Sequence, residues 1–145
     1  SLIDVEERDL NNVLKKIRNK ELDGINVTLP YKQKIIQFID QVINDAKSTN
    51  SVNTIFLDES NTLVGENTDV FGLQAAYLKE INEAENKKVL VIGAGGVSPS
   101  VIFSLQKSRM QNISIINRTF EKSIFLKKKI PISKNIKMGF SKRRN

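Results

Sequence analysis

The chain has 145 residues and a formal net charge of +7, and it contains neither cysteine nor histidine. This composition excludes a disulfide framework, a thiolate metal site and histidine acid–base chemistry, so any proton transfer must use Lys, Asp, Glu or Tyr, and we predict no metal site. No apolar run reaches the ~18 residues of a membrane span and no signal pattern opens the chain, so we expect a cytoplasmic protein without a membrane partner.

The first part of the chain alternates between helical and strand-like patterns. Apolar residues at helical spacing predict a helix over residues 5–20, and alternation predicts a short strand over 25–29. Pro30 suits the first turn of a helix, which we expect to run from residue 31 to about 46 with a break near Asp40. These patterns indicate a mixed α/β arrangement.

A hairpin and a helix are predicted next. Residues 52–57 and 62–66 read as strands, and the polar sequence "DESN" between them reads as a turn. Asp69 can act as the N-cap of a helix that continues to about residue 83.

The sequence "KKVLVIGAGGVSPSV" at residues 87–101 has the order of a phosphate-binding unit. Residues 89–92 read as a buried parallel strand, Gly93 allows a sharp turn, and Gly95 leaves room for a pyrophosphate to approach the backbone. A helix over about 97–107 would then present its N-terminal amides to the anion. A purely structural bend between a strand and a helix remains the alternative.

A second strand is predicted over residues 113–116, and Arg118 follows it closely. In dinucleotide-binding folds, an acidic residue at this strand end prefers NAD, whereas an Arg accommodates the 2′-phosphate of NADP. The sequence therefore predicts NADP as the cofactor.

Positive charge is concentrated at the C-terminal end. Residues 1–117 carry 13 basic and 15 acidic side chains, whereas residues 118–145 carry 10 basic and one acidic. A nucleic-acid-binding arm is one interpretation. The basic residues are scattered without regularly interleaved aromatics, so we expect a solvated tail over 131–145, with room for one short strand over 135–139, and no nucleic-acid partner.

Five motifs, in this order, resemble the shikimate dehydrogenase family. They are "GINVTLPYK" (24–32), "SVNTI" (51–55), "GENTD" (65–69), "VIGAGGVSPS" (91–100) and "INRT" (116–119). The resemblance implies a partial substrate-binding α/β domain over residues 1–67 and the first half of a Rossmann-type NADP-binding domain over 68–130. It also implies NADPH-dependent reduction of 3-dehydroshikimate to shikimate, a step toward chorismate and the aromatic amino acids.

The resemblance implies a role for single residues. Lys32 matches the family's catalytic lysine and Asp69 its paired carboxylate, while Thr28, Asn53 and Asp69 match contacts to substrate; Asn67 is assigned a supporting role. A lysine beside a carboxylate suits proton donation to a carbonyl oxygen, because the opposite charge favours the protonated amine. The residues matching the NADP site are Gly93, Ala94, Gly95, Gly96, Val97, Asn117, Arg118 and Thr119.

Each of these residues also has an ordinary structural interpretation. Lys32 and Arg118 could be solvated surface charges, and Asp69 could be a plain N-cap. Asn53 could satisfy a turn, and Thr28 could be an ordinary strand residue.

The chain also departs from the family pattern. The family's serine-containing substrate-carboxylate motif is not matched, Asn50-Ser51 stands where the family usually has Gly-Ala, and the second half of a Rossmann domain is not seen. We therefore expect a chain truncated at both ends, a monomer or homodimer, with little activity alone. A quinate/shikimate dehydrogenase using NAD, a methylenetetrahydrofolate dehydrogenase and a non-catalytic NADP-binding fragment remain alternatives.

Overall fold

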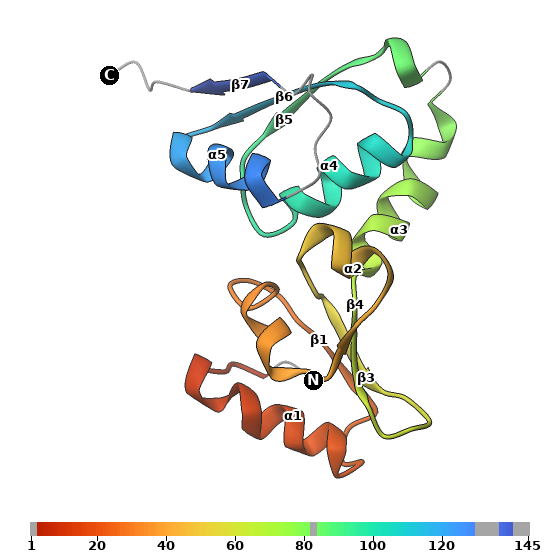
Figure 1. The fold of residues 1–145 in the computed structure, drawn as a ribbon, viewed down its shortest axis with the longest axis vertical. Coiled ribbons are helices and arrows are strands. Elements are labelled where there is room, and N and C mark those ends of the chain that lie inside the picture. Colours follow the sequence, from red (N-terminus) through yellow and green to blue (C-terminus); the bar gives the residue numbers. More distant parts are fainter. Residues whose placement is uncertain (1–2, 82–83, 130–136, 141–145) are drawn as a thin grey trace.

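In a computed structural model, which describes residues 3–81, 84–129 and 137–140, the chain forms two lobes that each contain one sheet (Figure 1). The first sheet has the order β1-β3-β4-β2 and is antiparallel except for the parallel pair β2 and β4. Its strands are β1 (Gly24–Asn26), β2 (Gln41–Val42), β3 (Thr54–Leu57) and β4 (Leu63–Glu66). The predicted hairpin is confirmed, because β3 and β4 pair as neighbours across the polar turn.

The core of the first lobe lies between its sheet and helix α1 (Leu10–Arg18). The helix follows a 3-10 turn over Glu7–Asp9 and buries Leu10, Leu14 and Ile17. These positions recur at a spacing of three to four residues and therefore form one apolar stripe that packs on the sheet.

The helix expected over residues 31–46 is wrong. A 3-10 turn (Lys34–Phe38), strand β2 and the short helix α2 (Asn44–Thr49) occupy this segment, and Pro30 lies in a turn after a cis peptide bond. Asp40 explains the difference: its carboxylate accepts hydrogen bonds from the guanidinium of Arg18 and from the backbone N–H of Leu63. These tertiary contacts hold the chain at the sheet edge and override the helical pattern.

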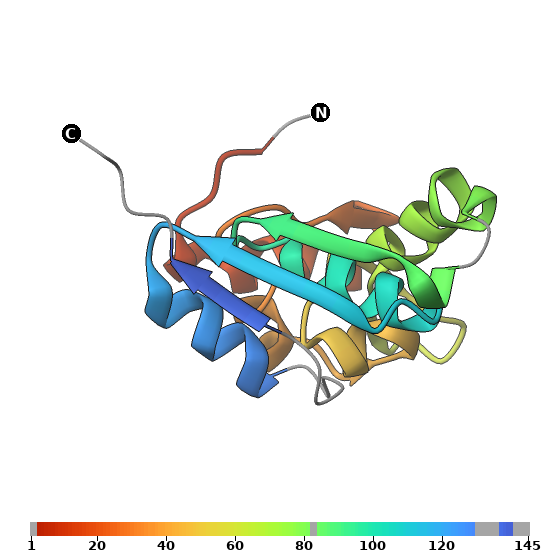
Figure 2. The ribbon, with the colours of Figure 1, turned by 90° about the horizontal axis from the view of Figure 1, so that it is seen from above.

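The second lobe confirms the predicted strand–turn–helix–strand unit. Its parallel sheet has the order β5-β6-β7, and the helices lie on one side of it (Figure 2). Buried side chains of α4, β6 and α5 form its core. The elements are β5 (Lys88–Ile92), α4 (Ser98–Lys107), β6 (Asn112–Asn117), α5 (Phe120–Lys129) and β7 (Lys137–Phe140), so residues 137–140 of the expected tail form a strand.

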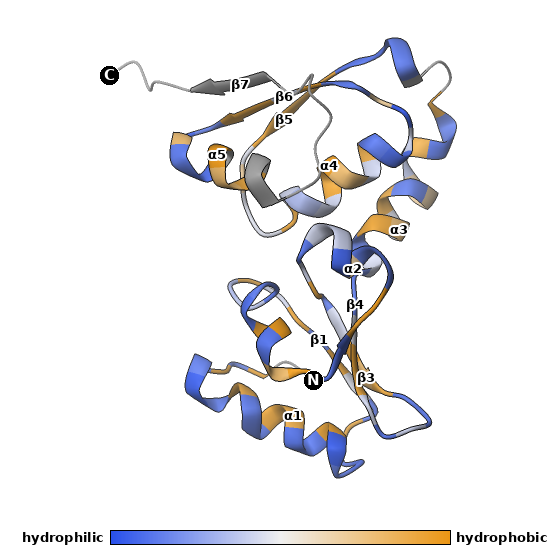
Figure 3. Ribbon diagram, viewed as in Figure 1, coloured by the Kyte–Doolittle hydropathy of each residue, from blue (hydrophilic) through white to orange (hydrophobic). Residues whose placement is uncertain are grey.

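The expectation that β5 is buried on both faces is wrong. Val89 and Val91 pack toward the core, but Leu90 and Ile92 are 53% and 82% exposed. Figure 3 shows the apolar character of β5 and β6. Parallel sheets are usually covered by other elements on both faces. Here, no described element covers the face that carries Leu90 and Ile92.

Helix α3 (Thr68–Ala76) joins the lobes and packs against α4. It ends earlier than residue 83, and 3-10 turns at Leu78–Glu80 and Ala84–Asn86 follow. Asp69 is not its N-cap: Asn67 holds that position, and its side chain accepts a hydrogen bond from the backbone N–H of Asp69. Within the described part of the chain, no helix is long and apolar enough to cross a membrane.

Candidate functional site

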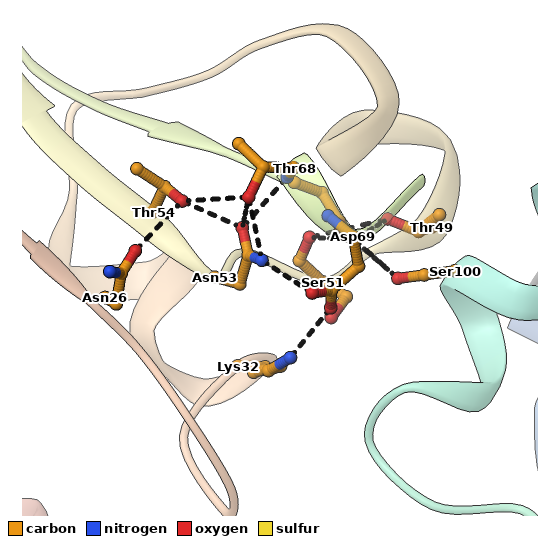
Figure 4. Close-up of polar contacts among 10 residues, drawn as sticks. Asn26, Lys32, Thr49, Ser51, Asn53, Thr54, Thr68, Asp69 and Ser100 are labelled. Carbon is orange, nitrogen blue, oxygen red and sulfur yellow. Dashed lines mark hydrogen bonds and ion pairs between the residues drawn. The ribbon is translucent and has the colours of Figure 1, made fainter. Parts of the chain in front are cut away.

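An ion pair joins Lys32 to Asp69, which lie 37 residues apart in the chain (Figure 4). Lys32 Nζ lies 2.8 Å from Asp69 Oδ2, and the two side chains are 13% and 24% exposed. Asp69 belongs to the first turn of α3, and Lys32 lies in the loop after β1. Because both groups are largely shielded from water, their attraction is stronger than that of a surface pair.

The Lys32 loop is tied to other segments by hydrogen bonds at Tyr31 and at Lys32 itself. The Tyr31 hydroxyl donates to the carbonyl of Val5 at 2.8 Å, and the N–H of Val52 donates to the carbonyl of Lys32 at 2.8 Å. The amine is therefore delivered from a loop that is tied to two other segments of the first lobe.

Asn53 engages the second oxygen of the same carboxylate. Its Nδ2 donates to Asp69 Oδ1 at 2.8 Å and to Thr68 Oγ1 at 3.1 Å, and its Oδ1 accepts from the Thr68 N–H at 2.9 Å. Both oxygens of Asp69 are thus occupied, which fixes the plane of the carboxylate. The amide of Asn53 is bonded to protein groups, so a contact to substrate would require it to exchange one of them.

The structure adds two hydroxyls that the sequence reasoning missed. Thr54 Oγ1 lies 3.0 Å from Asn53 Oδ1 and 3.3 Å from Thr68 Oγ1, so a row of polar groups continues away from the ion pair (Figure 4). Both threonines stand inside the quoted motifs, as the residues after Asn53 and Asn67. Their place in these motifs, next to residues already assigned to the site, was the sequence signal that could have identified them.

Thr28 is exposed on the loop that carries Lys32. Among the described residues its hydroxyl has no hydrogen-bond partner, and its carbonyl accepts from the N–H of Tyr31 at 3.0 Å. A free hydroxyl four positions before the lysine can still bind a ligand, so its substrate role stays a prediction.

The glycine turn after β5 has the geometry expected of an anion site. Gly93 has a φ of +113°, a conformation that favours glycine, and its N–H donates to the carbonyl of Ile116. Ser98 Oγ accepts from the Gly95 N–H and donates to the Gly93 carbonyl. In the part of the chain that the structure describes, the N–H groups of Gly96 and Val97 have no partner and can meet an anion.

Asn117 and Arg118 lie beside this turn at the end of β6. Asn117 Oδ1 accepts from the Ala94 N–H at 3.1 Å, and its Nδ2 donates to the Thr119 carbonyl at 2.6 Å. Asn117 therefore shapes the turn. The exposed guanidinium of Arg118 has no ion-pair or hydrogen-bond partner among the described residues, which leaves it free for a phosphate.

The glycine positions of the turn differ in the space available for a side chain. A Cβ on Gly95 would meet no protein atom within 4 Å, so the protein itself does not need glycine there, whereas a ligand approaching the backbone would. A Cβ on Gly96 would collide with the side chain of Leu29, which comes from the Lys32 loop. This contact places the Lys32 loop beside the glycine turn.

Comparison with known proteins agrees with this geometry. A sequence profile of the shikimate dehydrogenase substrate binding domain matches residues 1–55, and one described as shikimate / quinate 5-dehydrogenase matches residues 76–142. A curated NADP(+) shikimate dehydrogenase of Pelagibacter ubique is 37% identical over 135 residues, which are 93% of this chain and 51% of that protein.

Solved structures give the same result. The shikimate dehydrogenase of Aquifex aeolicus superposes with a TM-score of 0.80 at 33% identity, over 93% of this chain and 48% of that one. A shikimate dehydrogenase in complex with NADP+ superposes with a TM-score of 0.79 at 30% identity, over 95% of this chain and 49% of that one. The chain thus spans about half the length of the relatives it matches.

Proposed function

Because this chain belongs to the shikimate dehydrogenase family, we propose that its Lys32–Asp69 pair and glycine turn serve the NADPH-dependent reduction of 3-dehydroshikimate to shikimate. The observation that carries the proposal is the shielded ion pair with 2.8 Å between Nζ and Oδ2, on a loop whose Leu29 contacts the turn at Gly96. In this proposal, the proton donor for the ketone and the nucleotide site belong to these two adjoining segments.

The residues fit a reduced dinucleotide. When bound, NADPH supplies the hydride for the ketone carbon. Gly93 gives the sharp turn, Gly95 leaves open space above the backbone, and Arg118 offers an unpaired cation to the 2′-phosphate. Asn117 and Thr119 hold this turn in shape through the amide of Asn117.

Lys32 donates the proton in this proposal. Hydride addition to a ketone leaves negative charge on the oxygen, and the ammonium of Lys32 supplies the proton there while Asp69 orients it. Thr28 and the amide of Asn53 recognise substrate hydroxyls by hydrogen bonds. A site built in this way discriminates against analogues that lack a hydroxyl, because its own polar groups are then left unpaired.

We propose that the substrate-binding domain comprises residues 1–67 and the NADP-binding domain residues 68–130. The support is that each of the two sheets has its own core of buried side chains. Strand β7 (Lys137–Phe140) pairs with β6, so the second sheet continues beyond residue 130. Since the chain covers about half of its relatives, we expect it to bind ligands but to show little turnover alone. Turnover close to that of a full-length relative would contradict this expectation.

Calorimetric titration of the chain with NADPH, NADH and shikimate tests the proposal. Removal of a charge-assisted contact in Arg118→Ala should weaken NADPH binding by roughly 10- to 100-fold and leave NADH binding unchanged. Arg8→Ala, an exposed arginine of the other lobe, is the matched control. Equal affinity for NADH and NADPH would favour the alternative of a quinate/shikimate dehydrogenase using NAD.

A separate variant tests the proposed binding of substrate. Lys32→Met should weaken shikimate binding, whereas Lys34→Met, a surface lysine of the same segment, should not. Failure of the unmodified chain to bind either nucleotide or shikimate would overturn the proposed function.

A further inference from the structure

A buried polar cluster lies where the two lobes meet. It contains Asn67 at the end of β4, Thr49 and Ser51 from the first lobe, and Ser100 of α4 from the second. Burial of a polar side chain costs free energy unless the side chain is hydrogen-bonded. The hydrogen-bond partners of these residues therefore indicate the role of the cluster.

Asn67 is the centre of this cluster. Its Nδ2, with two hydrogens, lies within hydrogen-bond distance of three acceptors: Ser51 O at 2.9 Å, Thr49 Oγ1 at 3.0 Å and Ser100 Oγ at 2.9 Å. The Ser100 hydroxyl also donates to Asn67 Oδ1 at 3.3 Å. The same Oδ1 accepts from the N–H of Asp69 at 3.1 Å. One side chain therefore contacts α2, the segment before β3, the start of α3 and helix α4.

These contacts connect the glycine turn to the ion pair. Ser100 lies in the first turn of α4, directly after the glycine turn, and Asp69 lies in the first turn of α3. Asn67 is bonded to both, so a shift of α4 relative to the first lobe would displace the residue that fixes the start of α3. Asp69, and with it Lys32, would then change position relative to the glycine turn.

We propose that Asn67 is a positioning residue that sets Asp69 and Lys32 relative to the glycine turn, with Ser100 as its partner across the lobes. The consequence for catalysis rests on the proposed function. The consequence for the orientation of the two lobes does not depend on it. Neither residue is placed in contact with substrate or cofactor.

Other contacts between the lobes are weaker candidates. Lys107 of α4 pairs with Asp45 of α2 at 3.1 Å, but the lysine side chain is solvent-exposed, and exposed pairs contribute little. Ser104 Oγ donates to the Val70 carbonyl at 3.2 Å, but Val70 belongs to the connecting helix α3 and not to the first lobe, and the same hydroxyl also bonds to the Ser100 carbonyl of its own helix at 2.7 Å. The Asn67–Ser100 contact is buried on both sides and joins a side chain of the first lobe directly to a side chain of α4.

The orientation of the lobes can be measured without any ligand. Since the chain has no cysteine, spin labels on Lys16→Cys of α1 and Lys122→Cys of α5 would be the sole labels, and both positions are exposed. Ser100→Ala should broaden or shift the distance distribution between the labels. Alanine is favourable inside a helix, so α4 should persist in this variant. Lys107→Gln, which removes the surface contact alone, should leave the distribution unchanged.

The affinities for NADPH and for shikimate distinguish a positioning role from a general loss of stability. Ser100→Ala should leave NADPH affinity within about twofold, because the glycine turn is untouched, and should weaken shikimate binding in the presence of NADP+ by roughly tenfold. Asn67→Ala, which also removes the bond to the Asp69 N–H, should weaken shikimate binding further.

The outcomes separate the two proposals. An unchanged label distribution in Ser100→Ala overturns the positioning role, whatever the ligands do. A changed distribution together with equal losses of NADPH and shikimate affinity also overturns it, because the effect would then be general. Absence of ligand binding by the unmodified chain counts against the proposed function, while the label measurement still decides the orientation.

Discussion

The side chain of Leu29 occupies the space that a Cβ on Gly96 would need. Leu29 lies three residues before Lys32, and Gly96 lies in the glycine turn of the other lobe. Glycine at position 96 therefore serves a contact between lobes, which differs from the conformational reason for glycine at position 93.

We predict that Gly96→Ala displaces the Lys32 loop without unfolding the protein. Leu29 is 61% exposed, so the loop that carries it can move outward to make room for the new methyl group, and the free energy of unfolding should fall by less than about 1 kcal/mol. Shikimate binding, measured by calorimetry in the presence of NADP+, should weaken. The double variant Leu29→Ala/Gly96→Ala should recover part of the loss, and a double variant no better than Gly96→Ala would contradict the explanation.

Gly95→Ala should separate ligand binding from stability. A Cβ there meets no protein atom within 4 Å, so unfolding in urea should change by no more than about 0.5 kcal/mol. NADPH binding should weaken strongly, because the methyl group enters the space where a pyrophosphate approaches the backbone. Gly72→Ala in α3, where a Cβ also meets open space, is the control and should stabilise by about 0.5–1 kcal/mol without affecting NADPH. Unaltered NADPH affinity in Gly95→Ala would mean that the pyrophosphate lies elsewhere.

The glycine turn and its flanking elements could be predicted from the sequence because their signals are local. The apolar run of β5, the glycines, α4 and β6 lie within 30 residues, and the structure pairs β5 with β6 in parallel. The Lys32–Asp69 pair could not be derived in this way, since 37 residues separate its members. The resemblance suggested that they meet, and the fold brings them together by placing the Lys32 loop beside the start of α3.

The errors have tertiary causes. Residues 31–46 carry apolar side chains at a spacing that fits a helix, yet Asp40 is bonded to Arg18 and to the N–H of Leu63, two partners far away in sequence. In the same way, no local pattern shows that Asn67, and not Asp69, caps α3, because both residues are good N-caps.

Asp40 predicts a pH dependence of stability. Its hydrogen bond to Arg18, and next the N–H of Leu63, lower the pKa of this carboxyl below its ordinary value of 3.8. A lowered pKa in the folded state means that the stabilisation is complete well above pH 3.8 and is lost as the pH falls through the folded value. The side chain is 41% exposed, so solvent screening keeps the effect modest.

The test compares unfolding of the unmodified chain and Asp40→Asn in urea. The difference in unfolding free energy should be largest near neutral pH and should shrink below about pH 3.8. In Arg18→Gln, which removes the main cause, the Asp40→Asn substitution should have a smaller effect at neutral pH. A difference that is the same at neutral and acidic pH would rule out the carboxylate as its source.

Removal of the Ser51 hydroxyl should increase the stability of the protein. Ser51 is fully buried, and within the described part of the chain its Oγ has no hydrogen-bond partner. Its carbonyl, in contrast, accepts from Asn67 Nδ2, and this bond does not depend on the side chain. Ser51→Ala therefore removes an unpaired polar atom and should raise the free energy of unfolding by about 1 kcal/mol, or the Tm by about 2–4 °C.

Thr49→Val provides the matched control, because Thr49 is equally buried but its hydroxyl is fully used. Thr49 Oγ1 donates to the Asp45 carbonyl at 2.8 Å and accepts from Asn67 Nδ2 at 3.0 Å. Its loss should lower the free energy of unfolding by about 1–2 kcal/mol, because the Asp45 carbonyl and the Asn67 amide lose a partner. Opposite signs for the two variants would establish that pairing, and not burial, decides the contribution of each hydroxyl. A loss of stability in Ser51→Ala as large as that in Thr49→Val would show that the Ser51 hydroxyl is paired in solution.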